Sequence, residues 1–582
     1  MEDQTDGPEN LDGTGAMYHE THTELRNPAD ALRILAGSSK HENAALGPVA
    51  SHNLDNMTPS EMLTGDSLDG FELVMAGNLP LEVVFQLLES FCQNYHPFCP
   101  IVPSYMLGLS AARLIKKSDH FLLGVILTIA SRDSPQHLGM HSHCWAHTRQ
   151  LLLDITLAVP WTQKSRVVEG LLLLSEWLPH SMLEQSTSED FDHVFGEDRT
   201  AWSLIGLAVR YGYLMRIDTA AFRNVDQQEP REQQEYKRLI WTFIYIADRQ
   251  ISARLGQSFW SRGPSLSTRF TAKDFPTLTT LPGCGENYTS VLEATIELTQ
   301  ILHNAHAILY SSQERTRIMV RDGDYSRYLD DFQRAAQSWH TTWRDIQVST
   351  KLRLPLFLLF EYVCLYVNAF SFQAILARRQ AERRRSPNPR DRERGLTHPF
   401  EAGILRSPDG RYVFDAIDAA TNIITLMNDA DSQTDLRYLP SRYYLYSVYA
   451  SVFLYKASRA GAVRSKTQRE EIVALADGLI ASLGQTASSD SHIGRTYSNL
   501  LKRLDFRAMT GQCPPVASES DRELRNREGG TSQVAAGGTS AGHQDISSLA
   551  MQSDDFEITL PPLSDYDIEE FNNFTLGNIW QF

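Results

Sequence analysis

The side chains best suited to metal chemistry gather within one short stretch of the sequence. The stretch contains His137, His141, His143, Cys144 and His147. His143 and His147 are one helical turn apart, so both imidazoles could face the same side of a helix and bind zinc. A zinc site also needs a third and a fourth ligand held by packed partners, because ligand number and geometry must be satisfied together. We therefore interpret the cluster as polar residues at a loop-to-helix junction and predict no metal site.

The cysteines and the motif content give no sign of catalysis. Cys92 and Cys99 flank a Tyr-His-Pro-Phe turn without a Cys-x-x-Cys pair, so neither a zinc knuckle nor a redox motif is indicated. The chain has no phosphate loop, dinucleotide glycine fingerprint, nucleophile elbow or His-Glu-x-x-His helix. Six cysteines in 582 residues are too few for a disulfide scaffold. We expect no catalytic residues, no bound cofactor and no enzymatic activity.

A run of arginines is the main cationic feature of the chain. Eight arginines stand against three acidic residues between Arg378 and Arg394. Such a cluster can serve as a nuclear import signal, or it can be a solvated helix end favoured by the helix dipole. Both interpretations stay open. The candidate import residues are Arg378, Arg379, Arg383, Arg384 and Arg385.

The elements that position these side chains are expected to be helices. Apolar residues recur at helical spacing through the middle of the chain; Ile240, Ile244, Ala247 and Ile251, for instance, fall on one helical face. Alternating β-branched runs closed by tight glycine turns are almost absent, so we predict an all-α body. The apolar run Leu354 to Ala377 is long enough to span a bilayer. It carries Glu361, Asn368 and Gln373, which are costly in hydrocarbon, so we predict a buried core helix instead.

The charge and composition divide the chain into a neutral body and two acidic tails. The net charge is −17, with 12 acidic and 3 basic residues in 1–66, and seven acidic and no basic residues in 551–582. A near-neutral body offers no cluster of cations large enough to contact the phosphate backbone of DNA.

Composition and helical spacing together predict the order of segments along the chain. We expect a disordered acidic N-terminus (1–21), a short amphipathic helix (22–37), a linker (38–78), a helical regulatory domain (79–510, with a loop at 386–409), a disordered linker (511–550) and an acidic, aromatic segment (551–582).

Three stretches of this body carry a resemblance to a known family. They comprise Phe91 with Tyr95–Val102, then Ala201–Arg210 with Glu235–Trp241 and Asp248–Gly256, then Tyr366–Ala374 with Leu436–Arg442 and Ser451–Ala457. In this order and spacing, they resemble the helical regulatory domain of fungal zinc-cluster transcription factors. With Asn27–Leu32, they look like the subgroup that includes regulators of aromatic amino acid catabolism. We interpret the motif residues Trp202, Trp241, Asp248, Arg249 and Arg254 as scaffold, because tryptophans supply apolar area and charged residues can pair at helix termini.

The resemblance implies a nuclear regulator of RNA polymerase II genes, controlling a fungal metabolic or secondary-metabolite pathway. The helical domain would modulate an activation segment whose aromatic residues Phe556, Phe571, Phe574 and Trp580 contact coactivators. The family's six-cysteine, two-zinc module is expected ahead of Asn27, but residues 1–26 contain no cysteine. We therefore expect no sequence-specific DNA binding by this chain alone and no membrane association. DNA contact would come through a longer isoform that binds zinc, a DNA-bound partner or a homodimer. The alternative is an all-α small-molecule-binding protein or enzyme with a pocket inside the helical bundle.

Overall fold

All regular elements that the structure describes are helices. The structure is a computed structural model that describes residues 68–107, 115–134, 136–179, 192–222, 229–262, 270–276, 278, 286–385, 409–489, 492–502, 504 and 506–507. No strand occurs within these residues. The predicted all-α fold is confirmed.

The helices are joined by connections of very different length, from the few residues between α10 and α11 to the longer segments between α9 and α10 and between α13 and α15. In chain order the α-helices are α3 (Glu72–Met75), α4 (Leu81–Asn94), α5 (His120–Arg132), α6 (Leu138–Thr156), α7 (Ser165–Glu176), α8 (Asp192–Leu214), α9 (Arg231–Leu255), α10 (Tyr288–Leu309), α11 (Gln313–Asp322), α12 (Ser326–Trp343), α13 (Thr350–Arg385), α15 (Gly410–Asp429), α16 (Ser441–Arg459), α17 (Lys466–Thr486) and α18 (Ile493–Lys502). Short 3₁₀-helices include η3 (Leu68–Gly70), η4 (His96–Phe98) and η10 (Ile217–Phe222), and η14 (Ser432–Leu436) is a π-turn.

Local sequence signals fix several of these boundaries. The Asn287 side chain accepts a hydrogen bond from the Ser290 amide and caps the start of α10, and Ser465 caps α17 in the same way. At its other end, α9 stops at Gly256, whose φ of 63° lies in the left-handed region that glycine adopts at little cost. Caps and glycine stops of this kind let a chain rich in apolar helix formers break into separate helices.

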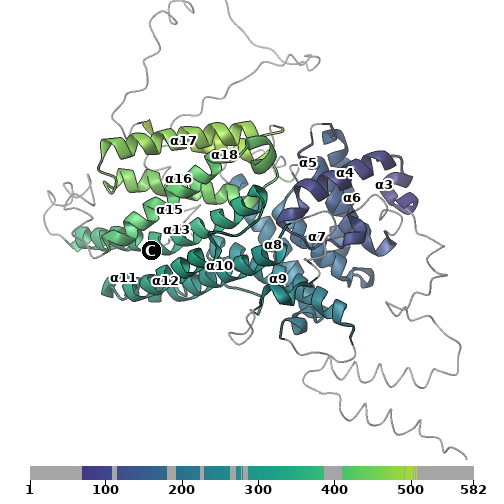
Figure 1. The fold of residues 1–582 in the computed structure, drawn as a ribbon, viewed down its shortest axis with the longest axis horizontal. Coiled ribbons are helices and arrows are strands. Elements are labelled where there is room, and N and C mark those ends of the chain that lie inside the picture. The colour runs from purple at the N-terminus through teal and green to yellow at the C-terminus, as the bar shows by residue number, and fades with distance from the viewer. Residues whose placement is uncertain are drawn as a thin grey trace, which may run out of the picture. The chain divides into compact units, whose positions relative to one another are not determined.

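Buried apolar side chains form two hydrophobic cores. The N-terminal core is built mainly from α3 to α9, and the C-terminal core mainly from α12 to α18. In Figure 1, α4 to α7 lie at the right and α15 to α18 at the left. Helix α10 serves both cores, because Leu292 and Ile296 belong to the first and Leu298 and Leu302 to the second. The boundary between the two cores is called the seam below.

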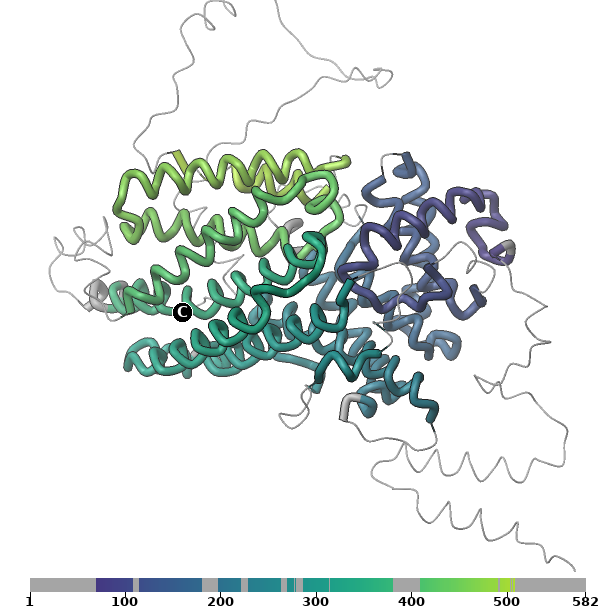
Figure 2. Tube along the Cα trace, in the orientation of Figure 1, coloured from purple at the N-terminus to yellow at the C-terminus, as the bar shows by residue number. Residues whose placement is uncertain are grey.

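Helix α13 is the central helix of the C-terminal core. It packs against α15 and α10, and the tube in Figure 2 shows α13 and α15 running side by side. Its segment Thr350–Arg379 is long and apolar enough to cross a membrane, but 83% of its most apolar window is buried inside the protein. The prediction of a buried core helix is confirmed.

The folded body begins earlier in the chain than the predicted domain boundary. The folded body begins by residue 68 rather than 79, because Phe71 and Leu73 are buried in the N-terminal core, so the predicted linker 38–78 ends earlier. Within the predicted helical domain, α11 forms although its sequence QERTRIMVRD has few apolar residues and so gives little helical spacing. The predicted segments 1–21, 22–37, 511–550 and 551–582 lie outside the described residues.

Candidate functional site

A partly open cavity of about 70 Å³ lies at the seam between the two cores. Its walls come from the turn after α4 and from α7, α9, α10, α13 and α16. Most of the wall is apolar, with Phe98, Leu172, Phe243, Ile246, Val291, Leu292, Leu352, Pro355 and Leu356. A cavity that is lined in this way by several helices and by both cores is a typical location for a small-molecule site.

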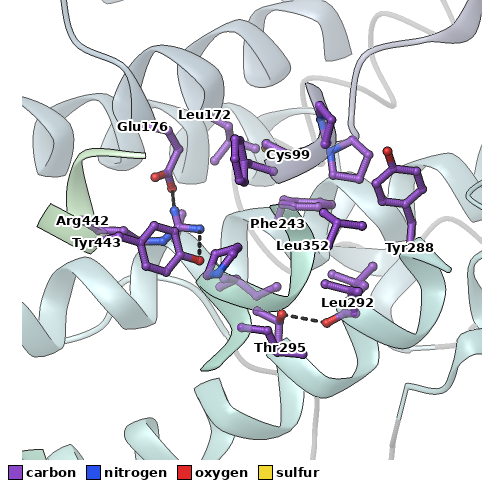
Figure 3. A pocket seen from close by; sticks show the side chains of 18 residues that line it. Cys99, Leu172, Glu176, Phe243, Tyr288, Leu292, Thr295, Leu352, Arg442 and Tyr443 are labelled. Atoms are coloured by element: carbon purple, nitrogen blue, oxygen red, sulfur yellow. Dashed lines mark hydrogen bonds and ion pairs between the residues drawn. The ribbon is translucent and has the colours of Figure 1, made fainter. Parts of the chain in front are cut away.

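The polar groups of this cavity gather at one end. The Glu176 carboxylate at the end of α7 forms an ion pair with the Arg442 guanidinium on α16, and the Arg442 side chain also donates to the Tyr443 hydroxyl. Figure 3 shows this pair at one end of the cavity and Tyr288 toward the other, with apolar side chains between them. The Ser441 hydroxyl donates to the Glu176 carbonyl oxygen at 3.1 Å, which further ties α16 to α7.

The charged end is largely shielded from water. The Glu176 and Arg442 side chains are 14% and 11% exposed. Burial by itself lowers the pKa of Arg442, but the Glu176 carboxylate and nearby tyrosine hydroxyls outweigh burial and hold that pKa above its usual range. Burial raises the pKa of the Cys99 thiol well above its ordinary value, so this wall residue is a neutral thiol and a poor nucleophile. The arrangement therefore suits binding rather than covalent catalysis.

A second cavity of about 20 Å³ adjoins the first and shares Glu176, Ala247 and Arg442 with it. We call it the polar cavity. Its wall includes Glu197 and Asp198 of α8 and Gln250 and Arg254 of α9. The Nε and Nη2 groups of Arg254 donate to the two carboxylate oxygens of Asp198, at 3.2 and 2.9 Å, so Arg254 is neutralised across the two helices. Burial, reinforced by the Asp198 carboxylate, raises the pKa of Glu197 to about 8.

A buried group of polar side chains lies close to the polar cavity, because Arg132 Nη1 donates to the carbonyl oxygen of the wall residue Leu178 at 3.1 Å. The Tyr95 hydroxyl donates to Asp133 at 2.9 Å, and Asp133 also pairs with Arg132 at 2.7 Å. Across the seam, the Trp177 indole donates to the Tyr438 carbonyl oxygen at 3.0 Å. Tyr95, Asp133 and Arg132 are buried on the N-terminal side, whereas Tyr438 is half-buried, so the Trp177–Tyr438 bond is the one of these contacts that links α7 to the segment before α16.

The predicted scaffold residues are placed in well-packed surroundings. The Asp248 carboxylate pairs with Arg249 and accepts hydrogen bonds from the Trp260 and Ser261 amides, which anchors the segment after α9. Both charged side chains are at least 97% buried. These two residues pair in the middle of α9, rather than at a helix terminus as the sequence suggested, because each also bonds the returning loop.

The tryptophans of the same motif differ in exposure. Trp241 is fully buried and its ring lies 5.1 Å from the Tyr213 ring, measured between centroids. Trp202 is half-buried and packs against Trp260 at a centroid distance of 4.4 Å. Gly206 accommodates this pair, since a Cβ there would lie 1.9 Å from the Trp260 ring. Both tryptophans therefore supply packing area on α8 and α9.

The histidine cluster divides between the two sides of α6. His141 and His147 are buried, whereas His143 is exposed. His141 lies 3.2 Å from the Ser131 hydroxyl, and His147 lies 3.3 Å from the Glu72 carboxylate. Burial lowers the pKa of His147. Among the described residues, no group of three His, Cys, Asp or Glu side chains is arranged to hold a metal ion.

The structure describes the side chains of two residues of the predicted import cluster, Arg378 and Arg379. Arg378 pairs with Asp409 and its guanidinium donates to the Tyr325 hydroxyl at 2.9 Å, so it joins α13 to the start of α15. Arg379 also interacts with its surroundings. The side chains of Arg383, Arg384 and Arg385 lie outside the described residues, as do Phe556, Phe571, Phe574 and Trp580.

All three family-like stretches contribute to the two cavities. Pro97, Phe98 and Cys99 come from the first stretch, Ala201, Gln250 and Arg254 from the second, and Ser441 and Arg442 from the third. Sequence reasoning missed Glu176, Glu197 and Asp198, which complete the charged wall. The only signal for Glu176 was a lone carboxylate at the end of the apolar run Leu171–Leu174.

Comparison with known proteins identifies a similar transcription factor. The chain is similar to transcription factor hmgR of Aspergillus fumigatus, with 22% identity over 475 residues, which make up 71% of this chain and 60% of that protein. The chain therefore spans less than two thirds of the relative's length. No protein-family model and no solved structure matches the chain. The similarity supports a fungal transcription factor family, but tests neither the subgroup nor the absence of a zinc-cluster module.

Proposed function

We propose that this chain is a transcription regulator whose helical body acts as the regulatory domain. The observation that carries the proposal is the similarity to a transcription factor over 71% of the chain. The same similarity supports a non-enzymatic role. The polar contacts across the seam, Glu176 with Arg442 and Trp177 with Tyr438, support a domain in which the two cores are coupled, so that a change at the boundary can be transmitted between them.

The proposal extends to the genes and the compartment. The chain would act in the nucleus on RNA polymerase II genes of a fungal metabolic or secondary-metabolite pathway. DNA contact would come from a zinc-cluster module in a longer isoform, from a DNA-bound partner or through a homodimer. The near-neutral charge of the body supports DNA contact by another module or partner, because sequence-specific DNA binding needs clustered cations at the phosphate backbone.

The activation function is assigned to residues 551–582. The segment carries seven carboxylates, and Phe556, Phe571, Phe574 and Trp580 would supply apolar anchors for a coactivator groove with a basic rim. Fusing residues 551–582 to a heterologous DNA-binding domain tests this assignment in a reporter assay. We expect activation that is lost when Phe571, Phe574 and Trp580 are changed to Ala. Replacing one or two carboxylates by their amides is the matched control and should leave most of the activity, whereas an inert parent fusion would overturn the assignment.

Recruiting the whole chain to a promoter tests the regulatory role. Residues 1–582 fused to the same DNA-binding domain should change reporter output relative to the DNA-binding domain alone. If the helical body restrains the tail, a fusion of 551–582 alone should activate more strongly than the full chain. Equal output from the full-chain fusion and from the DNA-binding domain alone would contradict the proposal.

A second function, small-molecule binding within the bundle, is favoured by one specific observation. The cavity at the seam combines an apolar wall with a shielded charged end. The two functions are compatible, because a ligand at the boundary between two cores can shift how they pack.

A further inference from the structure

One of the two adjoining cavities is mostly apolar and the other is polar, and this difference indicates the kind of ligand that would fill both. The larger cavity is apolar, and the polar cavity begins where Glu176, Ala247 and Arg442 line both. A molecule that fills both would need a compact apolar body and a hydrogen-bonding end. The larger cavity is partly open, so a longer molecule could extend outward from it.

The polar cavity contains hydrogen-bonding capacity that the described residues do not use. The Gln250 amide oxygen, one carboxyl oxygen of Glu197 and the Arg442 Nε are buried and have no hydrogen-bond partner among the described residues. The Gln250 and Glu197 residues are 2% and 9% exposed. Buried polar groups normally find partners, because leaving one unpaired costs its full desolvation penalty. Three such atoms around one cavity point to a bound polar group.

The charges around the two cavities cancel. Arg442 is paired with Glu176 and Arg254 with Asp198, so each cation already has its anion. Burial and the neighbouring Asp198 carboxylate raise the pKa of Glu197 to about 8, against the smaller opposing effects of Arg132 and Tyr497, so this acid is mostly protonated at neutral pH. A charged ligand would therefore remain uncompensated in a shielded site.

We infer that the joined cavities bind a small uncharged molecule, whose compact apolar body occupies the seam and whose amide or hydroxyl end reaches Gln250, Glu197 and Arg442. Protonated Glu197 and Arg442 would donate hydrogen bonds to a ligand oxygen, and Gln250 would accept one from a ligand N–H or O–H. Larger uncharged molecules with the same end would place their remainder outside the cavity. This inference concerns the binding activity of the chain and does not depend on the transcriptional role.

A matched series of probes tests the inference on the purified full chain. Isobutyramide, isobutyrate and isobutylammonium share one branched apolar body and differ in charge. Ligand-observed NMR at millimolar concentration should show binding of isobutyramide at neutral pH, and binding of both ions weaker by about tenfold or more. Equal binding of the three probes, or no binding of isobutyramide, would overturn the inference and leave water as the only occupant of the polar cavity.

Variants locate the bound probe. Ala247 lines both cavities, so the larger side chain of Ala247→Leu should abolish isobutyramide binding, whereas Ala146→Leu on the exposed face of α6 should not. Thr295→Met fills the larger cavity from a different helix, which keeps the test valid if Ala247→Leu fails to fold. Isobutyramide binding that survives in a folded filling variant would place the probe elsewhere and contradict the inference.

Discussion

The Glu176 carboxylate at the end of α7 is paired with the Arg442 guanidinium on α16, and this pair joins the two hydrophobic cores at the wall of the cavity. Both side chains are mostly shielded from water. The pair therefore has a structural role across the seam and also sets the charge of the candidate ligand site.

Breaking this pair should destabilise the protein strongly. Glu176→Gln leaves the Arg442 charge buried without its anion, and removing one partner of a buried pair typically costs about 3 to 5 kcal/mol. We expect a loss at the lower end of that range in urea denaturation, because both side chains keep some contact with solvent. The control is Asp345→Asn, which breaks the exposed Arg344–Asp345 pair and should cost under about 1 kcal/mol. Equal effects of the two variants would show that the seam pair is not shielded in solution.

Asp248 should be the most sensitive residue of the segment that follows α9. Asp248→Asn removes the anion beside Arg249 and weakens the acceptor for the Trp260 and Ser261 amides. We expect roughly 3 kcal/mol of destabilisation and faster proteolysis within residues 257–262. Asp322→Asn, in the exposed Arg321–Asp322 pair, is the control. Unchanged cleavage of the segment in Asp248→Asn would contradict its anchoring role.

The stability of the protein should depend on the protonation of Glu197. Because its pKa is raised to about 8 in the folded chain, the folded state binds more protons than the unfolded state above the ordinary carboxyl pKa. This contribution to stability is complete at acid pH and is lost as pH rises toward 8. Glu169 acts in the same direction, since burial raises its pKa to about 7 against the opposing effect of Arg166.

The variant Glu197→Gln isolates this contribution. The difference in unfolding free energy between the wild-type chain and Glu197→Gln should shift against the wild type as pH rises from about 5 to 8. Chemical denaturation at a series of pH values measures it, and the contributions of other titrating groups cancel in the difference. A pH-independent difference would mean that Glu197 is ionised throughout this range.

The sequence predicted the fold better than it predicted the candidate site. Helical spacing such as Ile240, Ile244 and Ile251 is local information, so the all-α body and the helix that became α9 were expected correctly. Phe71 and Leu73 were missed because the flanking sequence is polar and they become core only through packing against distant helices.

The site was less predictable because its residues are far apart in the chain. Glu176 meets Arg442 only when α7 packs beside α16, and Glu197 acquires its raised pKa only when buried next to Asp198. The resemblance did highlight Gln250, Arg254 and Arg442 as parts of larger motifs, but it gave a role only to Arg254, as scaffold. The unused hydrogen-bonding capacity of Gln250 and Arg442 is visible only in three dimensions.

Nuclear import should depend in part on the arginine run. Replacing Arg383, Arg384 and Arg385 by Ala should shift a fluorescent fusion of the full chain toward the cytoplasm, because import receptors bind clustered cations. Arg378 is left unchanged, since its pairing with Asp409 would confound import with stability. Replacing the exposed Arg321, Arg334 and Arg344 is the control. An unchanged nuclear signal in the first variant would assign the run to a solvated helix end.

The central claim is that the chain regulates transcription, and rapid depletion tests it most directly. The full chain, tagged in the organism that encodes it, is degraded within minutes while nascent transcripts and chromatin association are measured. We predict that the chain is enriched at a defined set of promoters and that transcription of those genes changes first after depletion. Absence of promoter enrichment together with unchanged nascent transcription would contradict the claim, even if the seam cavities bind an uncharged ligand.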